Sequence, residues 1–84
     1  MSDEVKVGEV IKFFAKPSVA AVKATGAIKV GDELRFKGVT TDFTEVVESM
    51  QIDNAPVTDV APGALVGIKI KDRVRPGDLV YKVS

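Results

Sequence analysis

The chain has 84 residues, of which 45% are hydrophobic and 29% charged, and its formal net charge is zero. This length suits a single domain, and we expect residues 1–84 to form one unit with residues 1–6 as a flexible N-terminus. The chain contains no histidine and no cysteine, which excludes disulfides, thiolate metal sites and the commonest general base. No apolar run reaches the roughly 18 residues of a membrane-spanning helix, and the N-terminal MSDEVKVG lacks the basic-then-apolar plan of a signal peptide. We therefore expect a cytoplasmic protein that makes no membrane contact.

The charges are distributed unevenly along the chain. Between Gly38 and Ile68 there is no Lys or Arg. That stretch instead holds the carboxylates, which are Asp42, Glu45, Glu48, Asp53 and Asp59. Basic residues flank this acidic middle on both sides. A zero total gives no argument for nonspecific attraction to nucleic acid, so any electrostatic binding must come from local clusters.

The N-terminal part of the sequence has the composition of β-strands. Residues 7–16 (VGEVIKFFAK) are rich in Val, Ile and Phe. They end at Lys16-Pro17, since proline cannot donate to a continuing ladder. Residues 18–25 (SVAAVKAT) predict a second strand with small alanines where close packing is possible.

The next strand predicted is residues 33–38 (ELRFKG), reached through a short connection that opens at Gly26. Its residues alternate, so Leu34 and Phe36 should share one face while basic residues occupy the other.

Residues 43–53 (FTEVVESMQID) are compatible with two structures. Val46, Met50 and Ile52 share a strand face, although Glu48 intrudes on it. The valines and Met50 also fit helical spacing. We favour one long twisted strand, bulged near Glu48, because no helix cap or stop signal flanks the segment.

Four segments follow in the C-terminal part. Residues 54–63 (NAPVTDVAPG) predict a loop, because they contain two prolines and end in glycine. Residues 64–70 (ALVGIKI) alternate as a strand, residues 71–78 (KDRVRPGD) read as a turn, and residues 79–83 (LVYKV) form the last strand.

The pattern predicts an all-β fold of six strands joined by turns. A domain this small must hide the edges of its strands, and closure into a barrel is the simplest way. The pairs Gly31-Asp32 and Gly77-Asp78 are predicted to be equivalent structural turns. Glycine takes a positive φ without a Cβ clash, and the Asp accepts from nearby backbone N–H groups.

The order of motifs resembles a known family. GAIKVGDELRFKG (26–38) is followed by APGALVGIKI (61–70) and VRPGDLVYKV (74–83). These segments resemble the second domain of translation GTPases of the elongation-factor-Tu type, where "G-x-[IL]-K-x-G-D", "A-G-x-x-V-G" and "R-G-D-x-[LV]" occur in that order. The resemblance covers about residues 7–83 and implies a six-stranded closed antiparallel Greek-key barrel. The sequence also looks like small stand-alone translation elongation factor-like proteins and like the barrel appended to collagenase-like peptidases.

Two departures limit what this resemblance implies. No G-x-x-x-x-G-K-[ST] phosphate loop is present, so nucleotide hydrolysis is not expected. Elongation factors carry a Gly-Arg-Gly-like bend beside the pocket for the aminoacyl end of tRNA. Residues 15–18 of this chain read Ala-Lys-Pro-Ser at that place, so the pocket residues do not carry over.

The sequence offers little for catalysis. Its serines have no histidine to activate them. Glu45 and Glu48 have opposite parity on a regular strand, which favours a solvated face over an acid–base pair. Asp53, Asn54 and Asp59 lack the dense ligand loop of a calcium site. We expect no catalytic residue, no metal and no cofactor.

The first binding candidate is the set Lys12, Phe14 and Lys16, which share strand parity. An aromatic ring between lysines can stack a nucleic-acid base while the ammonium groups meet phosphates. The alternative is that Phe14 belongs to the core. Ile11 and Phe13 form the competing apolar face.

The second binding candidate is a basic rim, formed by Lys69, Lys71, Arg73 and Arg75. Such a cluster suits RNA phosphates, with affinity that falls as salt rises. The alternative is a charged edge that prevents strands of different molecules from pairing.

From the resemblance we expect a non-catalytic, translation-factor-like binding module that contacts RNA or a ribosomal component. The alternative is a protein-interaction or accessory barrel for a separately encoded enzyme, such as a collagenase-like peptidase. In that case the acidic residues between 42 and 59 would face a basic protein partner.

Overall fold

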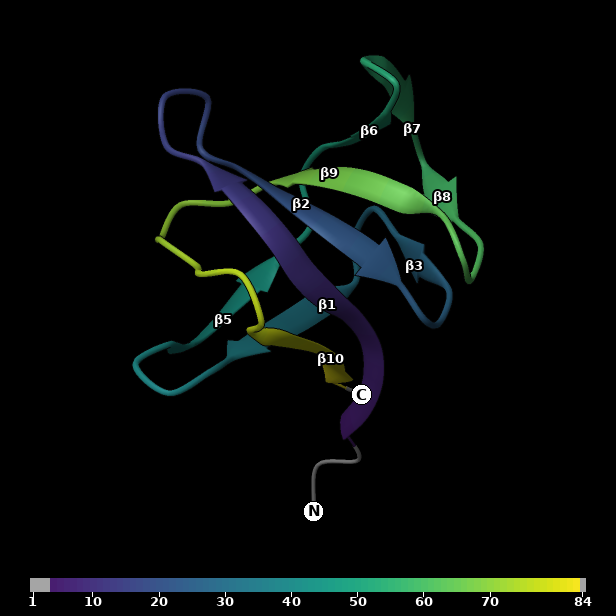
Figure 1. Ribbon diagram of the computed structural model, residues 1–84. Coiled ribbons are helices and arrows are strands. Elements are labelled where there is room, and N and C mark those ends of the chain that lie inside the picture. Colours follow the sequence, from purple (N-terminus) through teal and green to yellow (C-terminus); the bar gives the residue numbers. More distant parts are fainter. Residues whose placement is uncertain (1–3, 84) are drawn as a thin grey trace.

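The computed structural model describes residues 4–83 as an all-β chain, which confirms the predicted class. Figure 1 shows the strands crossing one another around a common interior. Within residues 4–83 there are ten strands: β1 (Glu4–Phe14), β2 (Val19–Ala24), β3 (Ile28–Lys29), β4 (Glu33–Lys37), β5 (Asp42–Val46), β6 (Met50–Ile52), β7 (Ala55–Val57), β8 (Asp59–Val60), β9 (Leu65–Lys69) and β10 (Leu79–Val83). No helix in this described range could span a membrane.

Strand β1 organises the sheet. The larger sheet has the order β5-β4-β10-β1-β2-β9-β6-β7, and β3 and β8 form a separate two-stranded sheet. All pairs are antiparallel. The β1 ladders shift register between Lys6 and Gly8 and between Val10 and Lys12. These bulges bend β1 so that its first half pairs with β10 and its second half with β2, as the long curved strand in Figure 1 shows.

Gly8 allows β1 to lie close to β2. A Cβ at Gly8 would lie 2.6 Å from the Cγ1 atom of Val22 in β2. Any side chain there would therefore push the two strands apart.

The core is built from the inward faces of the alternating strands. Leu34 and Phe36 are 0% and 1% exposed, as their alternation predicts. The Phe36 ring stacks on Phe43 of β5 with the ring centroids 5.1 Å apart. Loop residues also contribute, since Ile70 and Val74, in the connection from β9 to β10, are buried. This buried set holds both halves of the bent sheet around one core.

The first Gly-Asp turn redirects the chain into β4. Gly31 has a φ of 96°, in the left-handed region where a side chain is strained. The carboxylate of Asp32 accepts a hydrogen bond of 3.0 Å from the N–H of Lys29. The Gly31 N–H donates to the Val47 carbonyl and the Val47 N–H donates to the Asp32 carbonyl, each at 2.9 Å. The turn is thus pinned to a distant segment.

The second Gly-Asp turn repeats this scheme ahead of β10. Gly77 has a φ of 95°, and the Asp78 carboxylate accepts from the N–H of Arg75 at 2.9 Å. The Gly77 N–H donates to the Val10 carbonyl and the Val10 N–H donates to the Asp78 carbonyl, each at 2.8 Å. The two turns therefore have matching hydrogen bonds, one pinned at Val47 and the other at the β1 bulge.

The segment 43–53 differs from the single long strand predicted. Strand β5 ends at Val46 and β6 begins at Met50. Val47 between them is 3% exposed and gives both its backbone groups to the first Gly-Asp turn. That long-range pairing breaks the strand, and the chain changes from pairing with β4 to pairing with β9.

The segment 54–63, predicted as a loop, contains β7 and β8. Asp53 and Asn54 have φ values of 51° and 65°, which is the conformation of a two-residue hairpin turn. Pro56 lies in β7, which stands at an end of the strand order, where a missing N–H is tolerated.

The predicted closure into six strands with Greek-key order is not found. Strands β5 and β7 are the ends of the strand order, and no ladder joins them within residues 4–83. Beside β5, the Lys71 N–H donates instead to the Glu45 carboxylate at 2.8 Å. A side chain therefore takes the place of a backbone partner at this edge. Of residues 1–6, predicted as a flexible N-terminus, residues 4–6 belong to β1, while residues 1–3 lie outside the described part.

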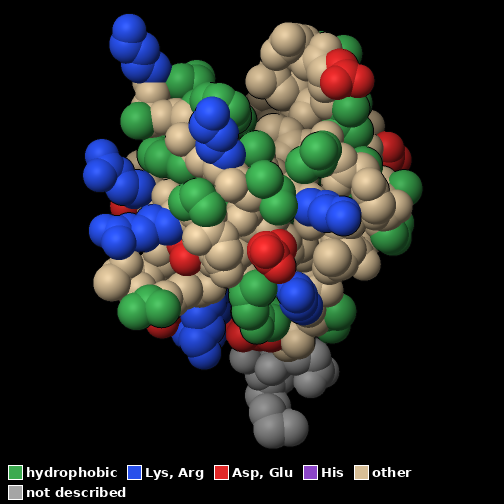
Figure 2. All heavy atoms as spheres, in the orientation of Figure 1, with side chains coloured by type: hydrophobic (Ala, Val, Ile, Leu, Met, Phe, Trp, Pro, Cys, Tyr) green, Lys and Arg blue, Asp and Glu red, His purple; other side chains and the backbone are tan. Residues whose placement is uncertain are grey.

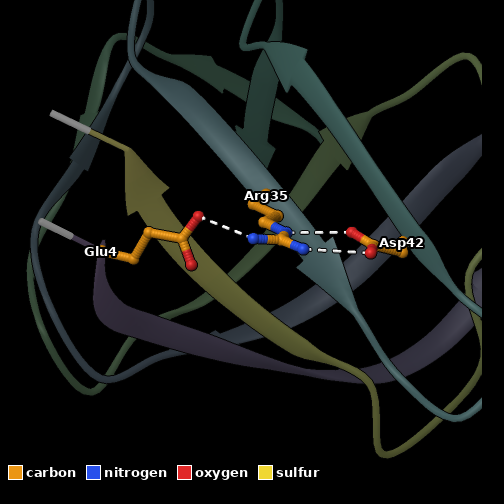
Figure 3. Close-up of polar contacts among 3 residues, drawn as sticks. All are labelled: Glu4, Arg35 and Asp42. Atoms are coloured by element: carbon orange, nitrogen blue, oxygen red, sulfur yellow. Dashed lines mark hydrogen bonds and ion pairs between the residues drawn. The ribbon is translucent and has the colours of Figure 1, made fainter. Parts of the chain in front are cut away.

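An ion-pair cluster joins the start of β1 to β4 and β5 (Figure 3). The Arg35 guanidinium donates to both oxygens of Asp42, at 2.9 and 3.0 Å, and to Glu4 at 3.0 Å. The hydrogen bond from Arg35 lowers the pKa of the Asp42 carboxyl. The same bond to Asp42, with a further one to Glu4, raises the pKa of the Arg35 guanidinium above its ordinary value.

Candidate binding groove on the outer face of the sheet

The residues of the first binding candidate lie at the end of β1. Phe14 is 44% exposed, whereas the neighbouring Phe13 packs against the core. The Nζ atom of Lys12 lies 5.1 Å from the centroid of the Phe14 ring, a distance typical of a cation–π contact. Lys16 lies beyond the strand, in the turn that leads to β2. Phe14 is thus a surface residue. The sequence left open which of the two phenylalanines faces the core, and the bulge before Lys12 determines that it is Phe13.

The basic rim extends from the end of β9 into the loop that follows this strand. Lys69 ends β9, where it pairs with Val19 of β2. The ammonium of Lys71 lies 3.3 Å from the Glu48 carboxylate, which neutralises it. Arg73 and Arg75 lie farther along the loop, and Arg75 lines a separate hollow of about 700 Å³ with Lys37 and Tyr81. Figure 2 shows basic side chains gathered over this loop and over the β1–β2 turn.

The acidic middle of the sequence makes contacts with basic residues of the same chain. Asp42 binds Arg35, and Glu48 pairs with Lys71. Glu45 accepts from the Lys71 N–H. Three of the five carboxylates of this stretch therefore make polar contacts within the chain.

A groove crosses the outer face of β2, β9 and β6, and we call it the sheet groove. It consists of two hollows that share Val19, Gln51 and Gly67. The larger hollow has a volume of about 470 Å³, and the smaller one, on the side of Lys69, about 240 Å³. The larger volume lies within the range of small-ligand sites. In Figure 2 the surface is hollowed between the β1–β2 turn and the β6–β7 hairpin.

Strand register explains why this face is hollow. Ala21 of β2, Gly67 of β9 and Gln51 of β6 lie opposite one another in a single outward-facing row. The first two have almost no side chain. A Cβ at Gly67 would lie 3.1 Å from the Val19 Cγ1 atom and 3.4 Å from the Gln51 Cγ atom. The neighbouring inward rows hold buried residues such as Ile68, so only the outer face is open.

The walls of the sheet groove are apolar and its ends are charged. Leu65 is 60% exposed and faces the groove together with Phe14. Lys69 lies at one end, while Asp53 and its hairpin lie at the other. Exposed apolar side chains grouped in a hollow are typical of a binding surface. The arrangement can hold an apolar group and, beside Lys69, an anionic one.

The sequence contained one signal for this groove. Gly67 interrupts an alternating strand, and a strand glycine often marks the close approach of another group. Phe14 and Lys69 were predicted as binding residues, but in two separate clusters. Val19 and Gln51 were not predicted, because their adjacency depends on the pairing of three separate strands.

The described residues also lack the groupings of side chains that hold metal ions. Among residues 4–83, no three His, Cys, Asp or Glu side chains come together as metal ligands. The sequence has no histidine or cysteine to act as base or nucleophile.

Comparison with known proteins finds sequence similarity to proteases. Over 93% of its length the chain is 39% identical to a protein of Methanocaldococcus jannaschii described as an uncharacterized protease. It is 31% identical, over 94% of its length, to a collagenase of Porphyromonas gingivalis. The chain spans about a fifth of the length of each, 19% and 20% respectively. No family model matches the chain.

A solved structure has the same fold. The C-terminal domain of a "putative U32 peptidase" from Geobacillus thermoleovorans superposes with a TM-score of 0.86, covering 92% of this chain and 90% of that one at 24% identity. A selenomethionine variant of that domain gives the same TM-score of 0.86 at 23% identity. This chain has the fold of that domain. The matches support the peptidase side of the expected resemblance and give the translation-factor side no support.

Proposed function

We propose that this chain is a non-catalytic accessory domain that works with a collagenase-like peptidase of the U32 type by binding polypeptide. The observation that carries the proposal is similarity to protease sequences over 93% of this chain, confined to about a fifth of the relative. A stretch that small is a module of the larger protein. The lack of histidine and cysteine is consistent with a module that leaves bond cleavage to the rest of the peptidase.

The sheet groove supports a polypeptide as the bound molecule. Its floor is made of small residues and its walls of Leu65 and Phe14, which are both exposed. Such a surface suits the side chains of an extended chain. The peptidase portion is either joined to the domain or encoded separately, and the accessory role is the same in both arrangements.

A chimera tests this proposal. The matched segment of the Porphyromonas gingivalis collagenase is deleted in one variant and replaced by this chain in another. Because the segment is proposed to recruit substrate, we expect the deletion to lower kcat/KM for gelatin. Cleavage of a short peptide, which cannot reach the domain and the catalytic site together, should change little. The chimera should restore the gelatin rate. A deletion variant that cleaves gelatin as fast as the intact collagenase would contradict the proposal.

RNA binding is the second candidate, and one observation favours it. The exposed Phe14 ring carries the Lys12 ammonium at 5.1 Å, with Lys16 in the following turn. Titration against bulk tRNA and rRNA tests it, since phosphate contacts make affinity fall steeply with salt. Absence of binding at low salt would remove this candidate, and salt-sensitive binding lost in Lys12→Glu would establish it.

A further inference from the structure

The smaller hollow of the sheet groove has the chemistry of a carboxylate site. The Lys69 N–H donates to the Ser49 carbonyl at 3.1 Å, so these two residues are neighbours. Both line the hollow together with Gln51. No carboxylate among residues 4–83 lies within ion-pair distance of the Lys69 ammonium. An ammonium, a hydroxyl and an amide there can each donate to an anion.

The larger hollow has the opposite character. Its lining includes Phe14, Val19, Ala21 and Leu65, all of which are apolar. Its only carboxylate is Asp53, at the far side from Lys69. An apolar side chain fits this hollow, whereas an acidic one would meet a like charge.

The two hollows follow one another along β9, since Leu65 and Gly67 line the larger one while Gly67 and Lys69 line the smaller one. Leu65, Gly67 and Lys69 project from the same face of β9, because side chains alternate along a strand. Successive outward positions on a strand are about 6.8 Å apart, which is also the spacing of side chains i and i+2 in an extended ligand. A ligand lying along β9 would place one side chain in each hollow.

We propose that the sheet groove binds an extended polypeptide segment whose apolar and carboxylate side chains are two residues apart. The apolar side chain occupies the larger hollow, and the carboxylate meets Lys69 in the smaller one. The polypeptide class rests on the proposed function, and the acidic residue is set by charge complementarity within the groove. This assigns a sequence preference to the accessory domain.

A nucleic acid is a poorer occupant of the same groove. Phe14 is its one aromatic residue, and the floor is aliphatic. Asp53 at one end repels a phosphate backbone that would run the length of the groove. These features favour a ligand with a single anionic group.

The test is NMR titration of the ¹⁵N-labelled chain with blocked peptides. Gly-Leu-Gly-Glu-Gly and the reverse order Gly-Glu-Gly-Leu-Gly are compared with the same peptides carrying Lys in place of Glu. We expect one Glu peptide to bind about five-fold more tightly than its Lys counterpart, as for a favourable exposed ion pair. The shifted amides should include Gly67 and Gln51. Lys69→Glu should reverse the preference, while Arg73→Glu, outside the groove, should leave it unchanged.

Several results would overturn the inference. Equal affinity for the Glu and Lys peptides, shifts that avoid the groove, or a preference that survives Lys69→Glu would each do so. If poly(U) bound more tightly than the Glu peptides and shifted the same amides, the groove would be a nucleic-acid site and the inference would be rejected. If the collagenase chimera cleaves gelatin while no peptide binds the groove, this inference fails alone. If the peptides bind as expected and the chimera is inactive, only the proposed function fails.

Discussion

Replacement of Gly67 by a larger residue tests whether the sheet groove is open because it binds a ligand. If it is, the replacement should weaken binding without lowering the stability of the fold. Gly67 lies in the interior of β9, where glycine costs about 0.5–1 kcal/mol relative to alanine. An added Cβ would lie 3.1 Å from Val19 and 3.4 Å from Gln51, and both contacts are with half-buried side chains that can shift outwards. We therefore expect Gly67→Ala to stabilise the domain by about 0.5 kcal/mol, which raises Tm by about 2–4 °C.

A larger side chain at position 67 should also lower the affinity of the groove for its ligand. Gly67→Val places a branched side chain where the two hollows meet, so it should weaken binding of the Leu-Gly-Glu peptide by about tenfold, or about 1.4 kcal/mol. The assay pairs urea unfolding followed by circular dichroism with the NMR titration. The reasoning is refuted if Gly67→Ala destabilises the fold by more than about 1 kcal/mol, since the position would then be close-packed.

Three further predictions concern stability. Gly77→Ala should cost about 1–2 kcal/mol in urea unfolding, because its φ is 95° and no atom lies within 4 Å of an added Cβ, so the cost is conformational; an unchanged midpoint would contradict this. Arg35 lowers the pKa of Asp42, so Asp42 stabilises the fold above the ordinary Asp pKa of about 3.9 and loses that contribution as pH falls through the lowered value. Asp42→Asn should therefore be less stable than the native chain at pH 6, and this deficit should shrink as pH falls below the ordinary Asp pKa of about 3.9; a deficit that does not change with pH would be inconsistent. Phe36→Ala should cost about 3–5 kcal/mol, enough to unfold much of the chain, whereas fully exposed Val39→Ala should change stability by less than about 0.5 kcal/mol; similar losses in the two would refute the assigned core.

The alternation of apolar and charged residues correctly predicted those strands that stay regular along their length. Leu34 and Phe36 alternate with charged residues, and both are buried as that alternation requires. The prediction for the segment around Val47 was wrong because the backbone hydrogen bonds of Val47 go to a turn 15 or more positions earlier in the chain, at Gly31 and Asp32. Periodicity carries no information about such long-range bonds, so one strand was predicted where two are present.

The candidate site was predictable only in part. Phe14 was named as a binding residue, but its exposure depends on a bulge in β1 that the sequence does not specify. Lys69 was grouped with the basic residues after it, although the structure places it across β2 from Phe14. The groove itself arises from the register of β2, β9 and β6, which brings small residues from distant segments into one row.

The most direct measurement is gelatin cleavage by the collagenase chimera carrying Gly67→Val. Our account predicts that filling the groove lowers its kcat/KM to that of the deletion variant, while the chimera with Arg73→Glu keeps the restored rate. Equal gelatin cleavage by the Gly67→Val and unmodified chimeras would contradict the claim that this domain serves a peptidase through its sheet groove.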